Sequence, residues 1–253
     1  MEVSPGVHLF RTGGGNVCLV TEPELMIFDS GPVGGGPALL AAIRSLGLDP
    51  GGLHTLCLTH SDRGHAGGAI WLREHTGARI AASPSAAAVL GGRASPGPLR
   101  AGRAWIGRRL GRGLSAFDVD LELNEGDEIG GFTVLETEGH TRGDLCYFRE
   151  SDGLLIAGDA VRISGADILA PNFWTSHSEV SARIAISALA ELPVRVLIPG
   201  HGPAYALPHE ALRRAGGPPG FVEDLVRRRK EYRLARRKPK KNAPPGPKPD
   251  QRP

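Results

Sequence analysis

The sequence predicts an α/β protein built as a sandwich of sheets and helices. Two observations lead to this class. Short apolar stretches of β type are mixed along the chain with longer segments of helical spacing, and Gly, Asn and Pro turn residues separate them. In addition, the 253 residues are 40% hydrophobic, which suffices for a real core in one large domain or two small ones. Strands mixed with helices in this way indicate an α/β sandwich.

In the first half of the chain, strands and helices are bounded by glycine. "LHTLCLTH" is short, β-branched and apolar, which indicates a buried strand that ends in a glycine-rich stretch. Glycines close two of the expected helices, because glycine readily adopts the backbone of a helix C-terminus. We expect strands at residues 6–10, 16–20, 24–31, 53–60 and 78–83, and helices at 35–48, at 66–77 and from about residue 85.

The second half begins with residues 91–117, which contain no acidic residue and fit a long loop or a broken helix. Apolar and polar residues then alternate on both sides of "NEGDEIGG", which predicts a hairpin over residues 119–140. Two further strands are expected across "ESDG" within residues 144–160. A helix over 175–192 begins with a capping box, Ser176 with Glu179, and a last strand is expected at 194–202.

Charge divides the chain into two parts. The net charge of +3 combines 14 Lys+Arg against 4 Asp+Glu from Arg213 onward with 16 against 23 before it, that is, +10 and −7. We therefore expect one domain over residues 1–210 and a basic, Pro- and Lys-rich tail over 211–253 that is partly disordered. A basic tail can contact nucleic acid by counterion release. From Arg227 onward it contains a single aromatic, Tyr232, so no stacking platform favours that role.

The cysteines and the N-terminal sequence indicate the cellular compartment of the protein. Cys18, Cys57 and Cys146 are odd in number and lack CxxC spacing, which favours buried free thiols. "MEVSPGVHLF" lacks the profile of a signal peptide, and no apolar run approaches the ~20 residues of a membrane helix. A cytoplasmic protein without membrane contact is the resulting expectation.

Residues able to bind metal follow the expected strands at four places. They occur in "THSDRGH", "GHTRG", "AGDA" and "IPGHG", and they are His60, Asp62, His65, His140, Asp159 and His201. Strand ends at one sheet edge converge in space, so distant residues can build one site. Imidazole and carboxylate ligands suit Zn²⁺ and also Fe. A lone histidine in a loop is more often structural, so His8, His54, His75, His177 and His209 are given no role.

These four motifs, in this order and with an early "FDSG", resemble the metallo-β-lactamase superfamily. The resemblance covers about residues 3–208 and implies a four-layer αββα sandwich with metal ions at one edge between the sheets. It further implies that His60, Asp62 and His140 hold a first metal ion, that His65 and His201 belong to a second, and that Asp159 bridges the two.

Two positions depart from the family pattern. Asp62 stands where the family usually has His, and a carboxylate oxygen lies as many bonds from Cβ as the imidazole Nδ1 it would replace. Gly64 stands where the family usually has Asp, and glycine offers no ligand atom. We therefore expect the second metal ion to bind more weakly than the first.

The resemblance implies a hydrolase that uses metal-activated water, with Zn²⁺ as one or two ions and Fe as an alternative. Asp62 and Asp159 are the expected catalytic residues, and a small ester, thioester or lactone is the expected substrate. A glutathione thioester is a weaker expectation, because no extended C-terminal helical domain is recognised. The RNA-processing branch is disfavoured too, because it carries large additional domains.

Two other functions stay open. His60, His140 and Asp159 alone form the two-His, one-carboxylate set of a mononuclear Fe(II) oxygenase, as in the persulfide dioxygenases of this superfamily. Alternatively, Gly64 marks a catalytically weakened binding protein. Arg142 and the Arg-rich residues 93–112 are candidates to meet an anionic substrate, although a solvated face is the simpler interpretation.

Overall fold

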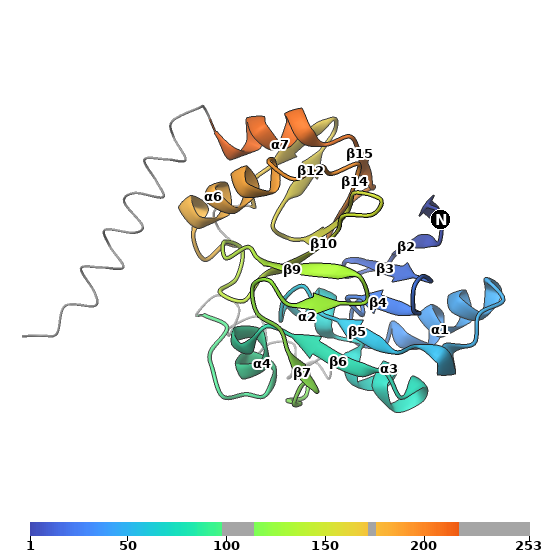
Figure 1. The fold of residues 1–253 in the computed structure, drawn as a ribbon. Helices are drawn as coiled ribbons and strands as arrows, with labels where there is room; N and C mark the ends of the chain where they lie inside the picture. Colours follow the sequence, from blue (N-terminus) through green and yellow to red (C-terminus); the bar gives the residue numbers. More distant parts are fainter. Residues whose placement is uncertain (98–113, 172–175, 218–253) are drawn as a thin grey trace, which may run out of the picture.

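Two mixed β-sheets pack face to face at the centre of the molecule (Figure 1). The computed structural model describes residues 1–97, 114–171 and 176–217. The first sheet has the order β1-β2-β3-β4-β5-β6-β7, and its pairs are antiparallel from β1 to β4 and parallel from β4 to β7. Its strands are β1 (Glu2–Ser4), β2 (Val7–Arg11), β3 (Asn16–Val20), β4 (Met26–Phe28), β5 (Thr55–Cys57), β6 (Arg79–Ala82) and β7 (Leu121–Glu122).

The second sheet has the order β15-β14-β11-β10-β9-β8, and within it only β11 and β14 pair in parallel. Its strands are β8 (Glu128–Ile129), β9 (Phe132–Glu136), β10 (Leu145–Arg149), β11 (Leu154–Gly158), β14 (Val196–Pro199) and β15 (Tyr205–Ala206). A separate antiparallel hairpin consists of β12 (Arg162–Ser164) and β13 (Asp167–Leu169).

Helices cover the outer faces of both sheets, so the predicted four-layer αββα sandwich is confirmed (Figure 1). Leu39 and Leu72 contribute to the core between the first sheet and its helices, and Ile186 and Leu212 to the core behind the second sheet. Between the sheets, Phe28 packs against Phe132, with ring centroids 4.8 Å apart. The helices are α1 (Gly36–Ser45), η1 (Pro50–Gly52), α2 (Arg63–Ala66), α3 (Ala69–Thr76), α4 (Pro84–Leu90), α6 (Glu179–Leu189) and α7 (His209–Gly216).

Three local features differ from the sequence-based expectations. The hairpin expected over residues 119–140 is confined to β8 and β9, whereas β7 pairs in parallel with β6 in the other sheet. Helix α6 is capped by Ser178, whose hydroxyl accepts from Ser181 N, and not by Ser176. Helix α7 extends the packed part of the chain past the expected boundary at residue 210, because Ala211, Leu212 and Ala215 are buried against the second sheet's helical layer.

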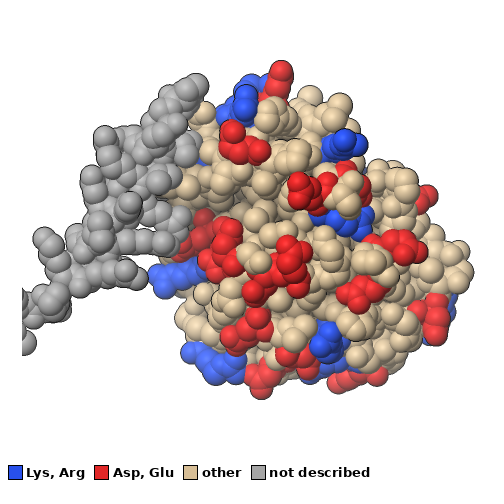
Figure 2. All heavy atoms as spheres, in the orientation of Figure 1, with Lys and Arg blue, Asp and Glu red and all other residues tan. Residues whose placement is uncertain are grey.

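The predicted tail lies outside the described residues from position 218 on, and so do residues 98–112 of the Arg-rich segment. Asp and Glu side chains, with Arg between them, are spread over the face of the body drawn in Figure 2, and this agrees with its net negative charge. In the ranges that the structure describes, no helix has both the length and the apolar character needed to cross a bilayer.

The topology brings five strand ends to one place. Asp29 directly follows β4, His60 follows β5, His140 follows β9, Asp159 directly follows β11, and His201 follows β14. Because β4 and β5 run parallel in one sheet, and β11 and β14 run parallel in the other, each pair delivers its residues to the same edge. This edge carries the candidate site.

Candidate metal centre

All six residues predicted from the sequence meet in one cluster between the two sheets. His60, Asp62 and His140 have ligand atoms within 4.8 Å of one another, and so do His60, His65 and Asp159. His201 joins through Nε2, which lies 3.5 Å from Asp159 Oδ2. Residues far apart in the sequence are therefore neighbours in the structure.

Two carboxylates face His140 at equal distance. Its Nε2 lies 3.3 Å from Asp62 Oδ2 and 3.3 Å from Asp159 Oδ2. His60 Nε2 lies 3.9 Å from each of the same two oxygens. Carboxylate oxygens and imidazole nitrogens thus point toward a common centre, at separations that one cation could bridge at about 2.0–2.2 Å from each ligand.

Asp159 lies between a first group, formed by His60, Asp62 and His140, and a second group, formed by His65 and His201. His65 Nε2 lies 3.6 Å from Asp159 Oδ1 and 3.4 Å from His201 Nε2. The two oxygens of Asp159 therefore face different histidines, Oδ1 toward His65 and Oδ2 toward His140 and His201. This is the arrangement that a bridging carboxylate requires.

The tautomer of His60 supports a cation at this centre. Thr59 Oγ1 lies 2.8 Å from Asp29 Oδ2 and 2.9 Å from His60 Nδ1. The hydroxyl has one proton, which it donates to the carboxylate, so it accepts from His60 Nδ1–H. His60 Nε2 then carries a lone pair, and it is buried without a hydrogen-bond partner among the described residues. A buried acceptor of this kind fits a metal ion.

Asp29 contacts two parts of the cluster, and the sequence analysis assigned it no role. Its carboxylate accepts from Thr59 N at 2.8 Å and from His65 Nδ1 at 2.7 Å, in addition to the Thr59 hydroxyl. One buried carboxylate thus orients two of the cluster's imidazoles, His65 directly and His60 through Thr59. The "FDSG" motif was the available signal, since it places this aspartate at the end of a buried strand.

The protonation states of the cluster follow from burial and charge. Burial, together with the neighbouring His65, lowers the pKa of His60 to about 4, so this imidazole is neutral at pH 7. Burial also disfavours the charged form of His65, but the Asp29 carboxylate outweighs it, and the pKa of His65 rises to about 9. Burial opposes ionisation of Asp159, yet its hydrogen bond with His201 and the nearby histidines hold its pKa well below the usual range.

Glycine main chain surrounds the cluster. A Cβ on Gly15 would lie 2.7 Å from His65 Cε1, and one on Gly200 would overlap Asp159 Oδ1. A Cβ on Gly64 would lie 2.7 Å from the carbonyl oxygen of Gly14. Position 64 therefore contributes no ligand, and the turn between β2 and β3 occupies the space beside it.

Two polar side chains hold the loops that carry His140 and His201. Asn16 Nδ2 donates to Pro199 O and Gly202 O, both at 2.8 Å, and so fixes the loop on either side of His201. Asp144 accepts from Thr141 N at 2.7 Å and closes the turn after His140. Burial raises the pKa of Asp144 to about 6. Both residues lie close to ligand-bearing motifs, but nothing in their spacing distinguished them from ordinary turn residues.

The fold and this edge of histidines and carboxylates define a metal-binding αββα protein. The chain matches the metallo-beta-lactamase superfamily over residues 11–201, and it belongs to that superfamily. The predicted family is thereby confirmed.

Sequence relatives cover parts of the chain. The uncharacterized protein YobT of Bacillus subtilis (strain 168) is 31% identical over 37% of this chain and 43% of its own length. A hydroxyacylglutathione hydrolase of Cereibacter sphaeroides (strain ATCC 17025 / ATH 2.4.3) is 30% identical over 51% of this chain and 44% of its own length. The chain thus spans less than half the length of these curated relatives.

Solved structures with the same fold cover more of the chain. The metallo-beta-lactamase family protein TTHA1429 from Thermus thermophilus is 23% identical, with a TM-score of 0.65 over 92% of this chain and 82% of its own. The metallo-beta-lactamase MIM-1 from Novosphingobium pentaromativorans is 25% identical, with a TM-score of 0.62 over 92% of this chain and 89% of its own. TTHA1623, described in a di-iron-bound form, has a TM-score of 0.63 at 22% identity and covers 81% of this chain and 96% of its own.

Proposed function

We propose that this protein is a metal-dependent hydrolase that cleaves a small ester, thioester or lactone with metal-activated water. The observation that carries the proposal is the buried, unpartnered Nε2 of His60, which faces Asp62, Asp159 and the other imidazoles. His60, Asp62 and His140 would hold a first ion, His65 and His201 a second, and Asp159 would bridge them. A divalent ion in such a site lowers the pKa of bound water from 15.7 to about 7 and polarises a carbonyl oxygen.

The protein's own groups would position the reacting atoms. Asp29 and Thr59 keep the Nε2 atoms of His60 and His65 directed at the centre. Asp159 stays ionised, because its pKa is held well below the usual range, and so it counters the charge of a bound ion. Asp62 is 29% exposed at the rim, where it can pass a proton between the site and solvent.

A thioester is the substrate kind that we favour. Relatives 30% identical to the chain are named hydroxyacylglutathione hydrolase, and this supports a thioester among the three classes. The chain spans only 44% and 35% of the length of those two relatives. The comparison therefore does not support glutathione as a part of the substrate.

A mononuclear iron oxygenase is the second candidate. His60, Asp62 and His140 form a compact two-His, one-carboxylate group, which is a ligand set of non-heme Fe(II) oxygenases. This set places Asp62 where the sequence-based hypothesis placed Asp159. Iron with oxygen consumption would favour this function over hydrolysis.

The deciding experiment joins metal analysis with a substrate panel. The purified chain would be analysed for zinc and iron, and then assayed with matched ester, thioester, lactone and phosphodiester substrates. We expect hydrolysis of at least one thioester, and a loss of 100-fold or more in kcat/KM for His140→Ala. His75→Ala is the matched control, because His75 is exposed on α3 and stacks on Trp71. Absence of hydrolysis in the metal-loaded protein would overturn the proposal.

A further inference from the structure

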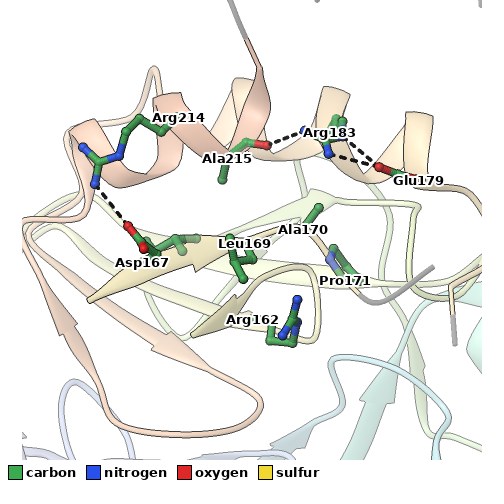
Figure 3. Close-up of a pocket in the computed structure, with 10 residues that line it drawn as sticks. Arg162, Asp167, Leu169, Ala170, Pro171, Glu179, Arg183, Arg214 and Ala215 are labelled. Atoms are coloured by element: carbon green, nitrogen blue, oxygen red, sulfur yellow. Dashed lines mark hydrogen bonds and ion pairs between the residues drawn. The ribbon is translucent and has the colours of Figure 1, made fainter. Parts of the chain in front are cut away.

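A cavity of about 500 Å³ lies between the β12–β13 hairpin and helices α6 and α7 (Figure 3). Figure 3 shows Arg183 and Arg214 on the two helices and Arg162 on the hairpin below them. Leu169, Ala170 and Pro171 supply apolar surface between these arginines. The cavity therefore combines an apolar wall with cationic groups, which is a usual composition for a small-molecule site.

Three connections join the elements around this cavity to the candidate metal ligands. Arg162 follows Asp159 by three residues, which span at most about 11 Å even when fully extended. Its neighbour Ile163 packs against the position next to His201, since a Cβ on Gly202 would lie 3.7 Å from Ile163 Cβ. On the other side, the segment that leads into α6 is bonded to the loop of His140, with His177 N donating to His140 O at 3.0 Å. A molecule of moderate length can therefore reach both places.

The charges that line the cavity do not cancel. Arg183 donates to Glu179 through Nε at 3.1 Å and through a terminal nitrogen at 3.0 Å, so this pair is neutral. Arg214 lies 3.8 Å from Asp167, in a loose and exposed pair. The side chain of Arg162 has neither an ion pair nor a hydrogen bond with any residue that the structure describes. The guanidinium of Arg162 thus lines the cavity without a counter-charge, and that of Arg214 has only the loose pair with Asp167.

We infer that this cavity binds an anionic end of the substrate, a carboxylate on a short apolar body, while the bond to be cleaved lies at the metal centre. A guanidinium presents parallel N–H donors that match the two oxygens of a carboxylate. Arg162 is the anchor, Arg214 assists, and Leu169 and Ala170 contact the apolar body. This inference rests on the proposed hydrolase function and narrows its substrate class.

The test compares three short thioesters that differ in whether they carry a negative charge and on which side of the scissile bond it lies. They are the valeryl and glutaryl thioesters of N-acetylcysteamine and the valeryl thioester of 3-mercaptopropionate. The first is neutral, the second is anionic on the acyl side, and the third is anionic on the thiol side. We expect kcat/KM for one anionic thioester to exceed that for the neutral one by at least tenfold, and Arg162→Ala to remove this preference through KM.

Control variants separate charge from folding. Arg162→Lys keeps the charge and should restore part of the preference. Arg44→Ala removes the same charge from an exposed site on α1, in the opposite helical layer, and should leave the preference unchanged. Equal kcat/KM for all three thioesters, or a preference that survives Arg162→Ala, overturns the inference and leaves the hydrolase proposal standing.

Binding without turnover provides a second measurement. If no thioester is cleaved, the hydrolase proposal fails, and titration calorimetry with valerate and with its neutral amide, valeramide, then tests the cavity alone. We expect valerate to bind at least fivefold more tightly than valeramide to the chain, and the two to bind equally weakly to Arg162→Ala. Equal affinities in the unaltered chain would overturn the inference as well.

Discussion

The carbonyl oxygen of Gly14 lies too close to Gly64 for that residue to carry a side chain. A Cβ on Gly64 would be 2.7 Å from that oxygen and 3.1 Å from the carbonyl carbon. In the other direction, a Cβ on Gly14 would be 2.8 Å from Gly64 Cα. Neither position therefore has room for a side chain, because main-chain atoms of the other glycine lie against it. The main chain of the β2–β3 turn fills the space beside the candidate metal ligands.

Gly64→Asp should destabilise the protein without adding a metal ligand. Because the side chain would meet main chain and not a movable side chain, we expect a loss of about 2 kcal/mol in the free energy of unfolding. Thermal unfolding and metal content would be measured together. Gly13→Ala is the matched control, since a Cβ there has nothing within 4 Å. A stable Gly64→Asp variant that gains large activity would instead indicate a site degraded by loss of that carboxylate.

Metal ions should bind in two unequal steps. The first group has three candidate side-chain ligands in His60, Asp62 and His140, whereas the second would depend on His65, on the exposed His201 and on the shared Asp159. We expect dissociation constants that differ by at least tenfold in competition with a chelator. His201→Ala should abolish the weaker step alone, and His140→Ala the tighter one. Two ions bound with equal affinity in equilibrium dialysis would contradict this expectation.

The sequence predicts the layers of the fold well but assigns short strands poorly. Long apolar stretches such as β3 and β11 are buried along their whole length, so their composition identifies them. β7 contains two residues, and the alternation around it fits a partner in either sheet. Its pairing with β6 depends on tertiary contacts that local alternation does not encode.

The candidate ligands were found because metal chemistry restricts them to a few residue types. Residues that position the ligands were not found in the same way. Asn16 and Asp144 act through hydrogen bonds to loops, and Asn and Asp occur in most turns for local reasons. The sequence did not identify Gly14 either. Glycine is needed there because the main chain of Gly64, which is 50 residues further along the sequence, lies against it.

Asp29→Asn should weaken metal binding more than it weakens the fold. Asp29 has a positive φ of 61°, which Asn tolerates, so the main chain can be kept. An amide nitrogen opposite His65 Nδ1 would donate to it and move the imidazole proton to Nε2, where it blocks a metal ion. We expect a 10- to 100-fold loss of metal affinity in chelator competition. Ser30→Ala should keep the affinity, because the Ser30 hydroxyl bonds to main-chain atoms of His65 and Gly68.

The three thiols should resist alkylation in the folded protein at pH values where a free thiol reacts. Burial raises the pKa of Cys18 and Cys146 from 9.0 to about 12, and it raises the pKa of Cys57 further still. The unfolded chain therefore loses these protons first, and the free energy of unfolding falls as the pH rises through 9, by about 1.4 kcal/mol for each thiol at pH 10.

Iodoacetamide followed by mass spectrometry measures this directly. Between pH 7 and 9, we expect no labelling of the folded chain at these positions, and labelling of all three in urea at a rate that increases with pH. Ser45→Cys, at an exposed position on α1, provides a thiol that confirms the reagent is active. Labelling of Cys57 in the folded protein at the rate of that control would mean that the reagent reaches the strand leading to His60, and the burial on which this prediction rests would then be wrong.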